Sequence, residues 1–298
     1  MHSELAGAVV ATQPNAIRAR LHPHERVILS FLAILAIAGF ARQVSFLGRV
    51  ILCLAPAVLW LIWFLESRLS KGWTRILREW ASLSLLLVAY WSLELFASQS
   101  QEGRQSIWLS WDRHVLYTIG LKHWIEAGGK ALPTLLETVY LLLYSLPPIC
   151  LATIYLSGAR RRSARFLHVL FLGTLTAYAL IPMFPVTSPR TAFPGVDLPA
   201  YLTFPRSINL WLLDHMDITT SVFPSGHVAV AFSCAFGLMR TVPSRQRLWM
   251  PAFAVAFLVY AATVYGRYHY AVDGFASICL ATLAWRVAEW LDSRGDGL

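Results

Sequence analysis

Eight long apolar segments follow one another along the chain and leave no polar block large enough for a soluble domain. A helix needs about 20 mostly apolar residues to cross a hydrocarbon core about 30 Å thick. Only 14% of the residues are charged, whereas soluble domains carry about 25%. The sequence therefore predicts an all-α, polytopic membrane bundle of about eight transmembrane helices. The predicted spans are residues 27–41, 49–65, 78–97, 134–156, 165–182, 223–241, 248–265 and 270–290.

The basic residues predict how this bundle lies in the membrane. If the N-terminus is cytoplasmic, 16 of the 25 Lys and Arg residues fall on the cytoplasmic side and 9 on the other. The short loop 158–165 alone carries four arginines, and short cytoplasmic loops are enriched in such residues. We therefore expect an integral membrane protein with both termini cytoplasmic. The lack of long polar tails favours a bacterial plasma (inner) membrane, and the net charge of +9 belongs to these loops rather than to a nucleic-acid interface.

The chain is expected to consist of an N-terminal part with two additional helices and a six-helix core domain. Residues 1–76 are predicted to form an N-terminal cytoplasmic segment and two additional transmembrane helices, and residues 77–298 a six-helix membrane domain. Within that domain, segment 98–133 interleaves tryptophan and apolar residues with charge. This pattern predicts an amphipathic helix in the outer interface, which the Gly128-Gly129 pair would end. Both a structural role and a role in lipid entry remain open for the segment.

Ionisable residues converge on the outer side of this predicted bundle. Arg190 follows the fifth span, His227 opens the sixth, and Arg267, His269 and Asp273 open the eighth. Such residues are costly at membrane depth, so their presence indicates function. His269 and Asp273 are four residues apart and share one helical face. The carboxylate can therefore accept the imidazole Nδ1–H and leave Nε2 as a nucleophile, although the same spacing also occurs in structural links between helices.

The segment Phe223-Pro-Ser-Gly-His227 stands where the sixth span begins. Pro224 suits a helix entrance and Ser225 can cap the helix. The N–H groups of Ser225, Gly226 and His227 would point out of the positive end of the helix, where phosphate binds readily. His227 could then protonate a leaving oxygen. An ordinary capped helix with an incidental histidine is the alternative interpretation.

Two arginines supply candidate partners for phosphate oxygens. Guanidinium groups bind such oxygens in a bidentate fork, and we assign this role to Arg190 and Arg267, although either could instead anchor to lipid headgroups. No cysteine or carboxylate spacing indicates a metal site, so no metal or cofactor is expected. The other ionisable residues of the outer side fall into two groups. Six are expected to be solvated loop residues: Asp112, His114, His123, Asp214, His215 and Asp217. Glu94 and Glu137, near the outer ends of spans, are expected to contact substrate or to pair between helices.

Pro224-Ser-Gly-His227 and Tyr268-His-Tyr-Ala-Val-Asp-Gly274 resemble the second and third signatures of the type 2 phosphatidic acid phosphatase superfamily. The H-Y-x-x-D form and the six core helices are most similar to the inositol phosphorylceramide synthase and sphingomyelin synthase branch. The resemblance covers the third span to the end of the chain. It implies a six-helix phosphatase-like core and a metal-independent lipid phosphotransferase or phosphatase with a phosphohistidine intermediate at the extracytoplasmic face.

The chain also departs from the family's signatures. The first signature has a lysine seven residues before an Arg-Pro pair, but here Met183 stands in that place and Thr191 follows Arg190. The phosphatase form of the third signature has an arginine six residues before the histidine, where this chain has Thr263. Arg267 lies only two residues before His269. Both departures fit the phosphotransferase-like branch better than a plain lipid phosphatase.

The resemblance and the site residues together predict a two-step mechanism. His269, oriented by Asp273, attacks the phosphorus of a lipid phosphate or phosphodiester donor, and His227 protonates the leaving oxygen. Water or an alcohol then accepts the phosphoryl group. A non-catalytic lipid or headgroup transporter, or a binding protein, is the alternative function. The phosphoryl oxygens are expected to contact Arg190, Ser225, Gly226 and Arg267.

Overall fold

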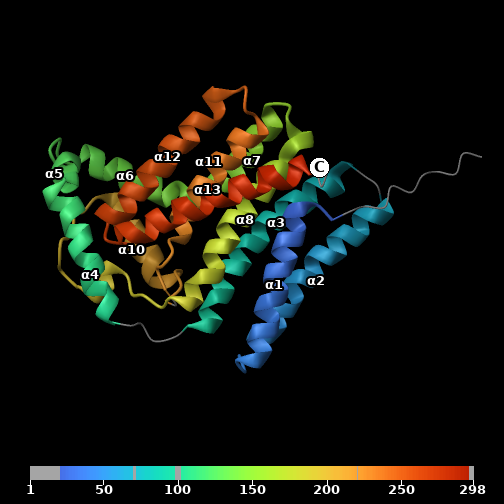
Figure 1. Ribbon diagram of the computed structural model, residues 1–298, viewed down its shortest axis with the longest axis horizontal. Coiled ribbons are helices and arrows are strands. Elements are labelled where there is room, and N and C mark those ends of the chain that lie inside the picture. The colour runs from blue at the N-terminus through green and yellow to red at the C-terminus, as the bar shows by residue number, and fades with distance from the viewer. Residues whose placement is uncertain (1–20, 70–71, 98–101, 220, 295–298) are drawn as a thin grey trace, which may run out of the picture.

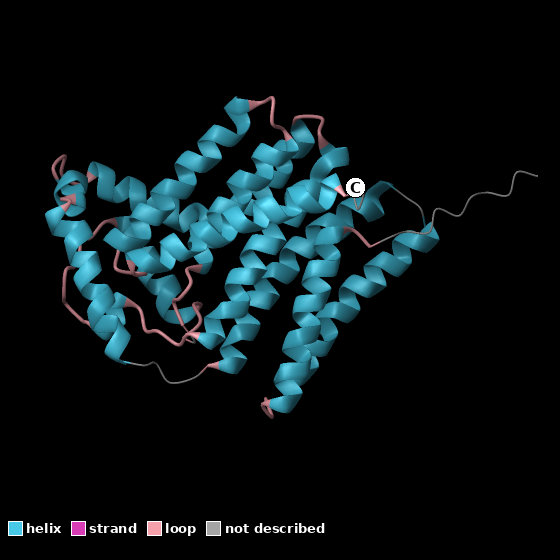
Figure 2. Cartoon of the chain, in the orientation of Figure 1, coloured by secondary structure: helices cyan, strands magenta, loops and turns pink. Residues whose placement is uncertain are grey.

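The computed structural model describes residues 21–69, 72–97, 102–219 and 221–294. Within these ranges the chain forms helices and no strand (Figure 2). Seven helical segments of the described residues are long and apolar enough to cross a membrane. The predicted all-α polytopic membrane bundle is therefore confirmed. These segments are Pro23–Ala41, Phe46–Glu66, Trp73–Phe96, Ala131–Leu156, Arg160–Met183, Gln246–Tyr265 and Ala271–Leu291.

The remaining predicted span, 223–241, is a shorter helix at the centre of the bundle. This helix, α11 (Gly226–Thr241), has 16 residues, most of them buried, and is about 24 Å long. It starts later than predicted because Pro224 precedes it and Ser225 caps it. Its neighbours are α7 (Leu146–Leu156), α8 (Ser163–Leu180), α12 (Gln246–Tyr265) and α13 (Ala271–Ser293).

The N-terminal helices form one edge of the bundle (Figure 1). Helices α1 (Pro23–Ala41), α2 (Phe46–Leu69) and α3 (Gly72–Ser92) pack against one another, and α1 and α3 also pack on α8. A buried guanidinium joins all three, because Arg78 of α3 bonds to Glu25 of α1 and to Glu66 of α2. Residues 1–20 of the predicted N-terminal cytoplasmic segment lie outside the described residues.

Side-chain contacts fix which helix ends share a face. Glu79, near the start of α3, accepts hydrogen bonds from Tyr155 at the end of α7 and from Ser163 at the start of α8. Near the end of α11, Arg240 donates to the carbonyl of Ala288 in the last turns of α13. The start of α1 and the end of α13 therefore lie at the same end of the bundle, which we call the terminal end. We call the opposite end, which carries His227, the site end.

Segment 98–133 forms short helices beside the site end, at the edge of the view opposite α1 and α2 (Figure 1). It contains α4 (Glu102–Arg113), the π-helical turn η2 (His114–Thr118) and α5 (Leu121–Glu126), and residues 98–101 lie outside the described residues. Trp111 and Trp124 are exposed, as an interfacial segment requires. Trp108 instead packs against Phe223 and Tyr270 beside the site, so the segment also forms part of the wall of the site end.

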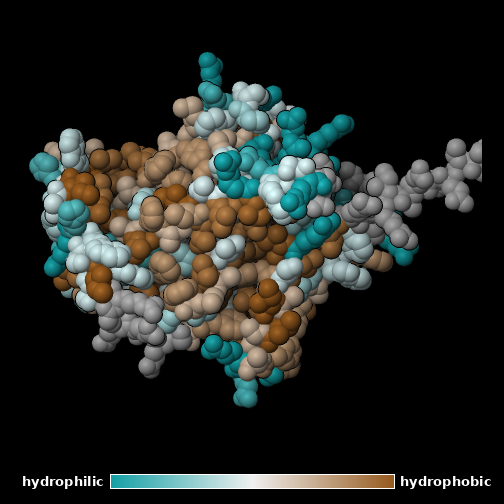
Figure 3. Space-filling view, in the orientation of Figure 1, coloured by the Kyte–Doolittle hydropathy of each residue, from teal (hydrophilic) through white to brown (hydrophobic). Residues whose placement is uncertain are grey.

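The surface has the pattern of a membrane protein. Hydrophobic residues cover much of the middle of the visible face, and hydrophilic residues gather toward its margins, at the upper right, along the left edge and at the lower tip (Figure 3). On the site end, α6 (Ala131–Leu142) continues through the turn η3 (Leu143–Ser145) into α7, and α10 (Phe204–His215) packs on α6. The short helix α9 (Pro189–Ala192) lies in the loop that follows α8. These elements surround the residues that the sequence analysis singled out.

Candidate active site

Helix α11 begins with Gly226 and His227 and is capped by Ser225. The Ser225 Oγ accepts a hydrogen bond from the N–H of Val228 at 3.3 Å. The N–H of Ser225 donates to the carbonyl of Asp273 at 3.2 Å, so it is not free for phosphate, in contrast to the prediction. The N–H groups of a first helical turn lack carbonyl partners inside the helix. A phosphate cradle at this end therefore rests on Gly226 and His227.

His227 and His269 contact each other although 42 positions separate them. The Nδ1 of His227 lies 3.3 Å from the Nε2 of His269. The Nδ1 of His269 lies 2.9 Å from the carbonyl oxygen of Val222, which can only accept, so this nitrogen carries the proton. In the neutral ring, Nε2 of His269 then bears the lone pair and accepts from the Nδ1–H of His227. This is the tautomer that a nucleophilic Nε2 requires.

Asp273 lies beside His269, as the spacing predicts. Its Oδ2 is 3.4 Å from the Nδ1 of His269 and accepts the N–H of Tyr270 at 2.9 Å. The Val222 carbonyl is thus the closer partner of the imidazole, and Asp273 is the second one. The Asp273 side chain is completely buried, and its Oδ1 has no partner among the described residues. The carboxylate can therefore stabilise positive charge on His269 at short range.

Two tyrosines approach the other nitrogen of His227. The hydroxyls of Tyr140 and Tyr144 lie 3.3 Å and 3.2 Å from its Nε2, and the Tyr140 ring stacks on the imidazole. Tyr140 in turn stacks on Tyr268 with 4.5 Å between ring centroids. Either phenol can donate to Nε2, which leaves the proton of His227 on Nδ1, the nitrogen that faces His269.

A buried ion pair fixes these rings. Glu137 bonds to Arg206 at 2.7 Å, and both side chains are almost fully buried. Glu137 also accepts from the Tyr268 hydroxyl at 2.6 Å and from the Asn209 amide. Arg206 donates to the Gly266 carbonyl as well. The sequence predicted either substrate contact or pairing between helices for Glu137. In the structure Glu137 pairs α6 with α10 through Arg206, and it contacts Tyr268 rather than the histidines.

His269 lines a polar pocket of about 130 Å³ together with Arg190. The Nη1 of Arg190 bonds to Asp214 at 2.8 Å, and its backbone N–H donates to the Arg267 carbonyl. Asp217, expected to be a solvated loop residue, lines the same pocket and accepts from the Tyr90 hydroxyl. The pocket thus offers one guanidinium, one carboxylate and several hydroxyl groups beside the candidate nucleophile. The hydroxyl groups belong to Tyr140, Thr187, Ser188, Thr191, Thr219, Ser221 and Tyr268.

Arg267 is placed differently from the prediction. Its side chain is completely buried, and its Nη1 bonds to Asp112 of α4 at 2.6 Å. The second carboxylate oxygen of Asp112 accepts the N–H of Ala271 at 2.8 Å. The Arg267 backbone adopts a positive φ of 64°, a conformation uncommon for residues other than glycine. Asp112, expected to be solvated, therefore holds the loop that carries His269, and Arg267 does not line the polar pocket.

His227 lines a second cavity, of about 290 Å³, and Gly226 lines it as well. The wall is mainly apolar and comes from α3, α7, α8 and α11; it includes Leu83, Leu86, Leu87, Leu143, Pro147, Pro148, Tyr178 and Val230. Leu87 and Tyr144 at this cavity are each 47% exposed. The cavity therefore reaches the apolar flank of the bundle, and the histidine pair stands between it and the polar pocket.

Burial sets the charge state of His269, which lies in the loop between the last two spans. Burial lowers the pKa of His269 to about 4, although Asp217 and the hydrogen bond to the Val222 carbonyl act in the opposite direction. The imidazole is therefore neutral near pH 7, with a free Nε2 lone pair. Such a ring can act as a nucleophile.

The structure brings His227, His269 and Asp273 together and places Arg190 in the polar pocket beside His269. Several partners of these residues were not predicted from the sequence. Val222 contributes its backbone carbonyl, and because every residue has one, the sequence carries no signal for this contact. The site tyrosines stand in an apolar span where aromatic residues are common, so their pattern gives no functional signal. Among the described residues, no group of three or more His, Cys, Asp or Glu side chains could hold a metal ion.

The comparisons with known proteins bear on this site. A family model described as the PAP2 superfamily matches residues 109–287, which is more than half of the chain. The match starts in α4, later than the third span where the resemblance was predicted to begin, and contains both histidines and Asp273. No curated protein and no solved structure matches the chain. With its helical membrane bundle and this matched region, the chain belongs to the PAP2 superfamily.

Proposed function

We propose that the protein transfers or hydrolyses lipid-linked phosphate through a phosphohistidine on His269. One observation carries this proposal: the contacting pair His227 and His269 stands between an apolar cavity and a polar pocket. A lipid phosphate has the same two-part chemistry, an apolar tail joined to a charged headgroup. The histidines stand where these two parts of such a substrate would meet.

In the first step the Nε2 lone pair of His269 attacks phosphorus, and the bond from phosphorus to the leaving oxygen breaks. His227 gives its Nδ1 proton to that oxygen, so the substrate replaces the present His227–His269 hydrogen bond. The Val222 carbonyl and Asp273 hold the Nδ1–H of His269 and stabilise the charged ring. Arg190 and the N–H groups of Gly226 and His227 face the phosphoryl oxygens.

In the second step the acceptor gives a proton to Nδ1 of His227 and attacks phosphorus. The N–P bond breaks, and His269 returns with its lone pair. If the acceptor is water the enzyme is a lipid phosphatase, and if it is a lipid, inositol or sugar hydroxyl the enzyme is a phosphotransferase. Met183, Thr191 and Thr263, which replace residues of the phosphatase signatures, favour the branch similar to inositol phosphorylceramide and sphingomyelin synthases. The charge distribution favours an extracytoplasmic site end and cytoplasmic termini.

The test is turnover by the purified protein in detergent with phosphatidic acid, a polyprenyl diphosphate, and a ceramide with phosphatidylinositol. Free phosphate identifies a phosphatase, and a new phospholipid without free phosphate identifies a transferase. We expect His269→Ala to abolish turnover and His227→Ala to lower it about 10²- to 10⁴-fold. The matched control is His215→Ala, which removes an exposed histidine of α10.

A phosphoenzyme trapped from a phosphorus-labelled donor sharpens the test. The label should be acid-labile, absent from His269→Ala, and attached to Nε2 rather than Nδ1, because the Val222 carbonyl occupies the Nδ1 side. Equal turnover by the wild type and His269→Ala would refute the mechanism. Binding of phospholipid without turnover of any donor would instead favour a lipid or headgroup transporter or binding protein.

A further inference from the structure

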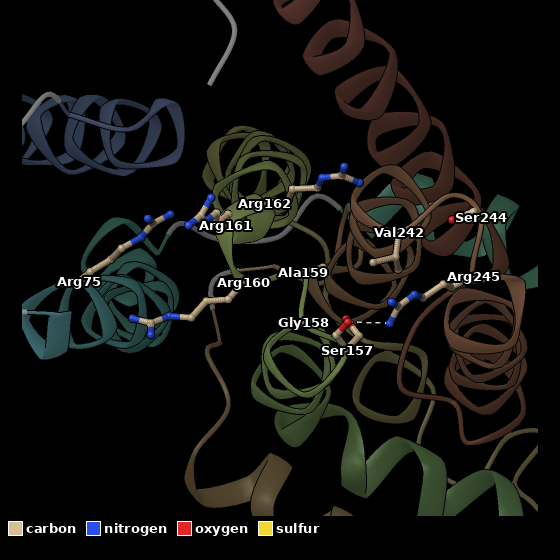
Figure 4. A pocket seen from close by; sticks show the side chains of 10 residues that line it. All are labelled: Arg75, Ser157, Gly158, Ala159, Arg160, Arg161, Arg162, Val242, Ser244 and Arg245. Atoms are coloured by element: carbon tan, nitrogen blue, oxygen red, sulfur yellow. Dashed lines mark hydrogen bonds between the residues drawn. The ribbon is translucent and has the colours of Figure 1, made fainter.

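The terminal end carries a cavity of about 770 Å³ that the catalytic proposal does not use (Figure 4). We call it the arginine pocket. It lies between the start of α3, the turn η4 (Arg160–Arg162) and the loop from α11 to α12. Among the described residues, the rest of its lining is small or apolar, and no acidic residue lines it. Five of the ten lining residues are arginines: Arg75, Arg160, Arg161, Arg162 and Arg245.

The local backbone directs several of these side chains toward one space. Gly158, with φ of +75°, ends α7 and turns the chain into η4. In Figure 4 the guanidinium groups of Arg75, Arg160 and Arg161 lie in the same part of the view, and Arg162 extends to the other side. Arg245 closes the cavity from the α12 side, because it donates to the Ser157 carbonyl at 2.6 Å.

The lining of the arginine pocket is positively charged, with no acid among its described residues. Glu79, which is buried, bonds to Arg75 at 3.3 Å and also accepts from Tyr155 and Ser163. The other acids of this region, Glu25 and Glu66, are bonded to Arg78. Among the described residues, the lining of the cavity thus holds five arginines and no acid, and Glu79 bonds to one of these arginines from behind the lining. Like charges held this close repel one another, and a bound anion removes that cost.

Membrane orientation explains basic residues on this face but not their gathering around one hollow. Arg247 lies two positions beyond Arg245, is exposed and does not line the cavity. The rule that places basic residues on the cytoplasmic side counts Arg247 and the pocket arginines alike, because it depends only on the side of the membrane. Guanidinium groups from three separate elements around one concavity form instead the arrangement that binds phosphate oxygens in bidentate pairs.

We propose that the arginine pocket binds a phosphate-bearing anion, either the headgroup of an anionic phospholipid or a soluble phosphate compound. This site is separate from the histidine pair, because α11 spans about 24 Å between His227 at its start and Val242, which follows its end and lines the pocket. The ligand therefore binds at the opposite end of the bundle from the proposed chemistry. The proposal holds whether or not that chemistry proves correct.

The test uses the full chain in detergent micelles. Native mass spectrometry follows the binding of phosphatidylglycerol and of phosphatidylcholine with the same acyl chains, and calorimetry follows inorganic pyrophosphate. We expect wild-type protein to prefer phosphatidylglycerol or to bind pyrophosphate. The double variant Arg160→Gln, Arg161→Gln should lose at least about tenfold in affinity, as expected for two charge-assisted contacts. Arg247→Gln removes one charge from the same face and should bind as wild type does.

The two arms distinguish the source of the phosphate. If the double variant loses affinity for phosphatidylglycerol alone, the ligand is a lipid headgroup. If it also loses affinity for pyrophosphate, the ligand is a soluble phosphate compound. Arg162→Gln, at an exposed position, provides a second variant if the double variant does not fold. The proposal is overturned if the wild type neither prefers phosphatidylglycerol to phosphatidylcholine nor binds pyrophosphate. It is also overturned if the pocket variants bind these ligands as tightly as Arg247→Gln does.

Discussion

The buried pair Asp112–Arg267 predicts a large and specific effect of Asp112→Asn. Both side chains are completely buried, and the Nη1–Oδ2 distance is 2.6 Å. Asparagine keeps an oxygen for the N–H of Ala271, which Asp112 now accepts at 2.8 Å. The substitution therefore keeps the hydrogen bond to Ala271 but removes the negative charge. In place of the charged oxygen, an amide N–H₂ then faces the Arg267 guanidinium, which can only donate.

The expected cost follows from the contacts that remain. Asp112 is the one partner of the Arg267 guanidinium among the described residues, since its Nε and Nη2 have none there. Removing one partner of a buried ion pair costs about 3–5 kcal/mol, because the other charge stays buried without compensation. We therefore expect Asp112→Asn to lower the free energy of unfolding by that amount. Turnover should fall with it, because the pair holds the loop that carries His269.

A double-mutant cycle with Arg267→Met separates stability from phosphate binding. Either single variant leaves a buried charge, whereas the double variant leaves none and should recover most of the lost stability. Unfolding free energies come from titration of sodium dodecyl sulfate into detergent micelles, followed by circular dichroism. If Arg267 acts only in the ion pair, turnover recovers with stability. If Arg267 also contacts phosphate, as the sequence predicts, stability recovers and turnover does not.

Two results would refute the reasoning about this pair. One is an unfolding free energy of Asp112→Asn within about 1 kcal/mol of the wild type, which is the range of an exposed ion pair. The other is a double variant whose loss equals the sum of the two single losses, because independent sites are additive. As a control, Arg113→Gln breaks the pair with Asp197 on its exposed side, where the Arg113 side chain is 51% exposed, and should cost about 1 kcal/mol.

The remaining predictions concern acid pH and the apolar cavity. Because burial lowers the pKa of His269 to about 4, kcat/KM should fall only as the pH drops through about 4, and an acid limb centred near 6.5 would contradict a buried nucleophile. The same shift means that His269 contributes its full stability above pH 6.5 and loses it as the pH falls from 6.5 to 4, because the folded state binds fewer protons there; chemical denaturation at several pH values measures this. Leu83→Trp, which fills the apolar cavity that Leu83 lines, should raise KM for long-chain lipids more than for dioctanoyl analogues, and an equal rise for both would place the tail elsewhere.

The sequence by itself determined that the chain is an all-α membrane bundle and where seven of its long apolar helices lie. Long apolar segments with 14% charged residues permit only helices in a bilayer, because each backbone polar group must be paired within its own segment. Closeness in sequence was sufficient to predict the contact between His269 and Asp273. The predicted shared helical face was wrong, because His269 lies in the loop before α13 and only Asp273 is helical. Capping chemistry was likewise sufficient to predict that Ser225 caps α11.

Only the tertiary structure decided which distant groups meet. Asp112 and Arg267 are 155 positions apart, and no local pattern distinguishes such an aspartate from a solvated one. The partner of the His269 Nδ1–H is a backbone carbonyl, that of Val222, and every residue type has such a carbonyl. Local periodicity specifies the face of a helix, whereas the packing of α4, α11 and the loop before α13 specifies what that face contacts. The physical reason is that packing sums many weak contacts between segments far apart in sequence.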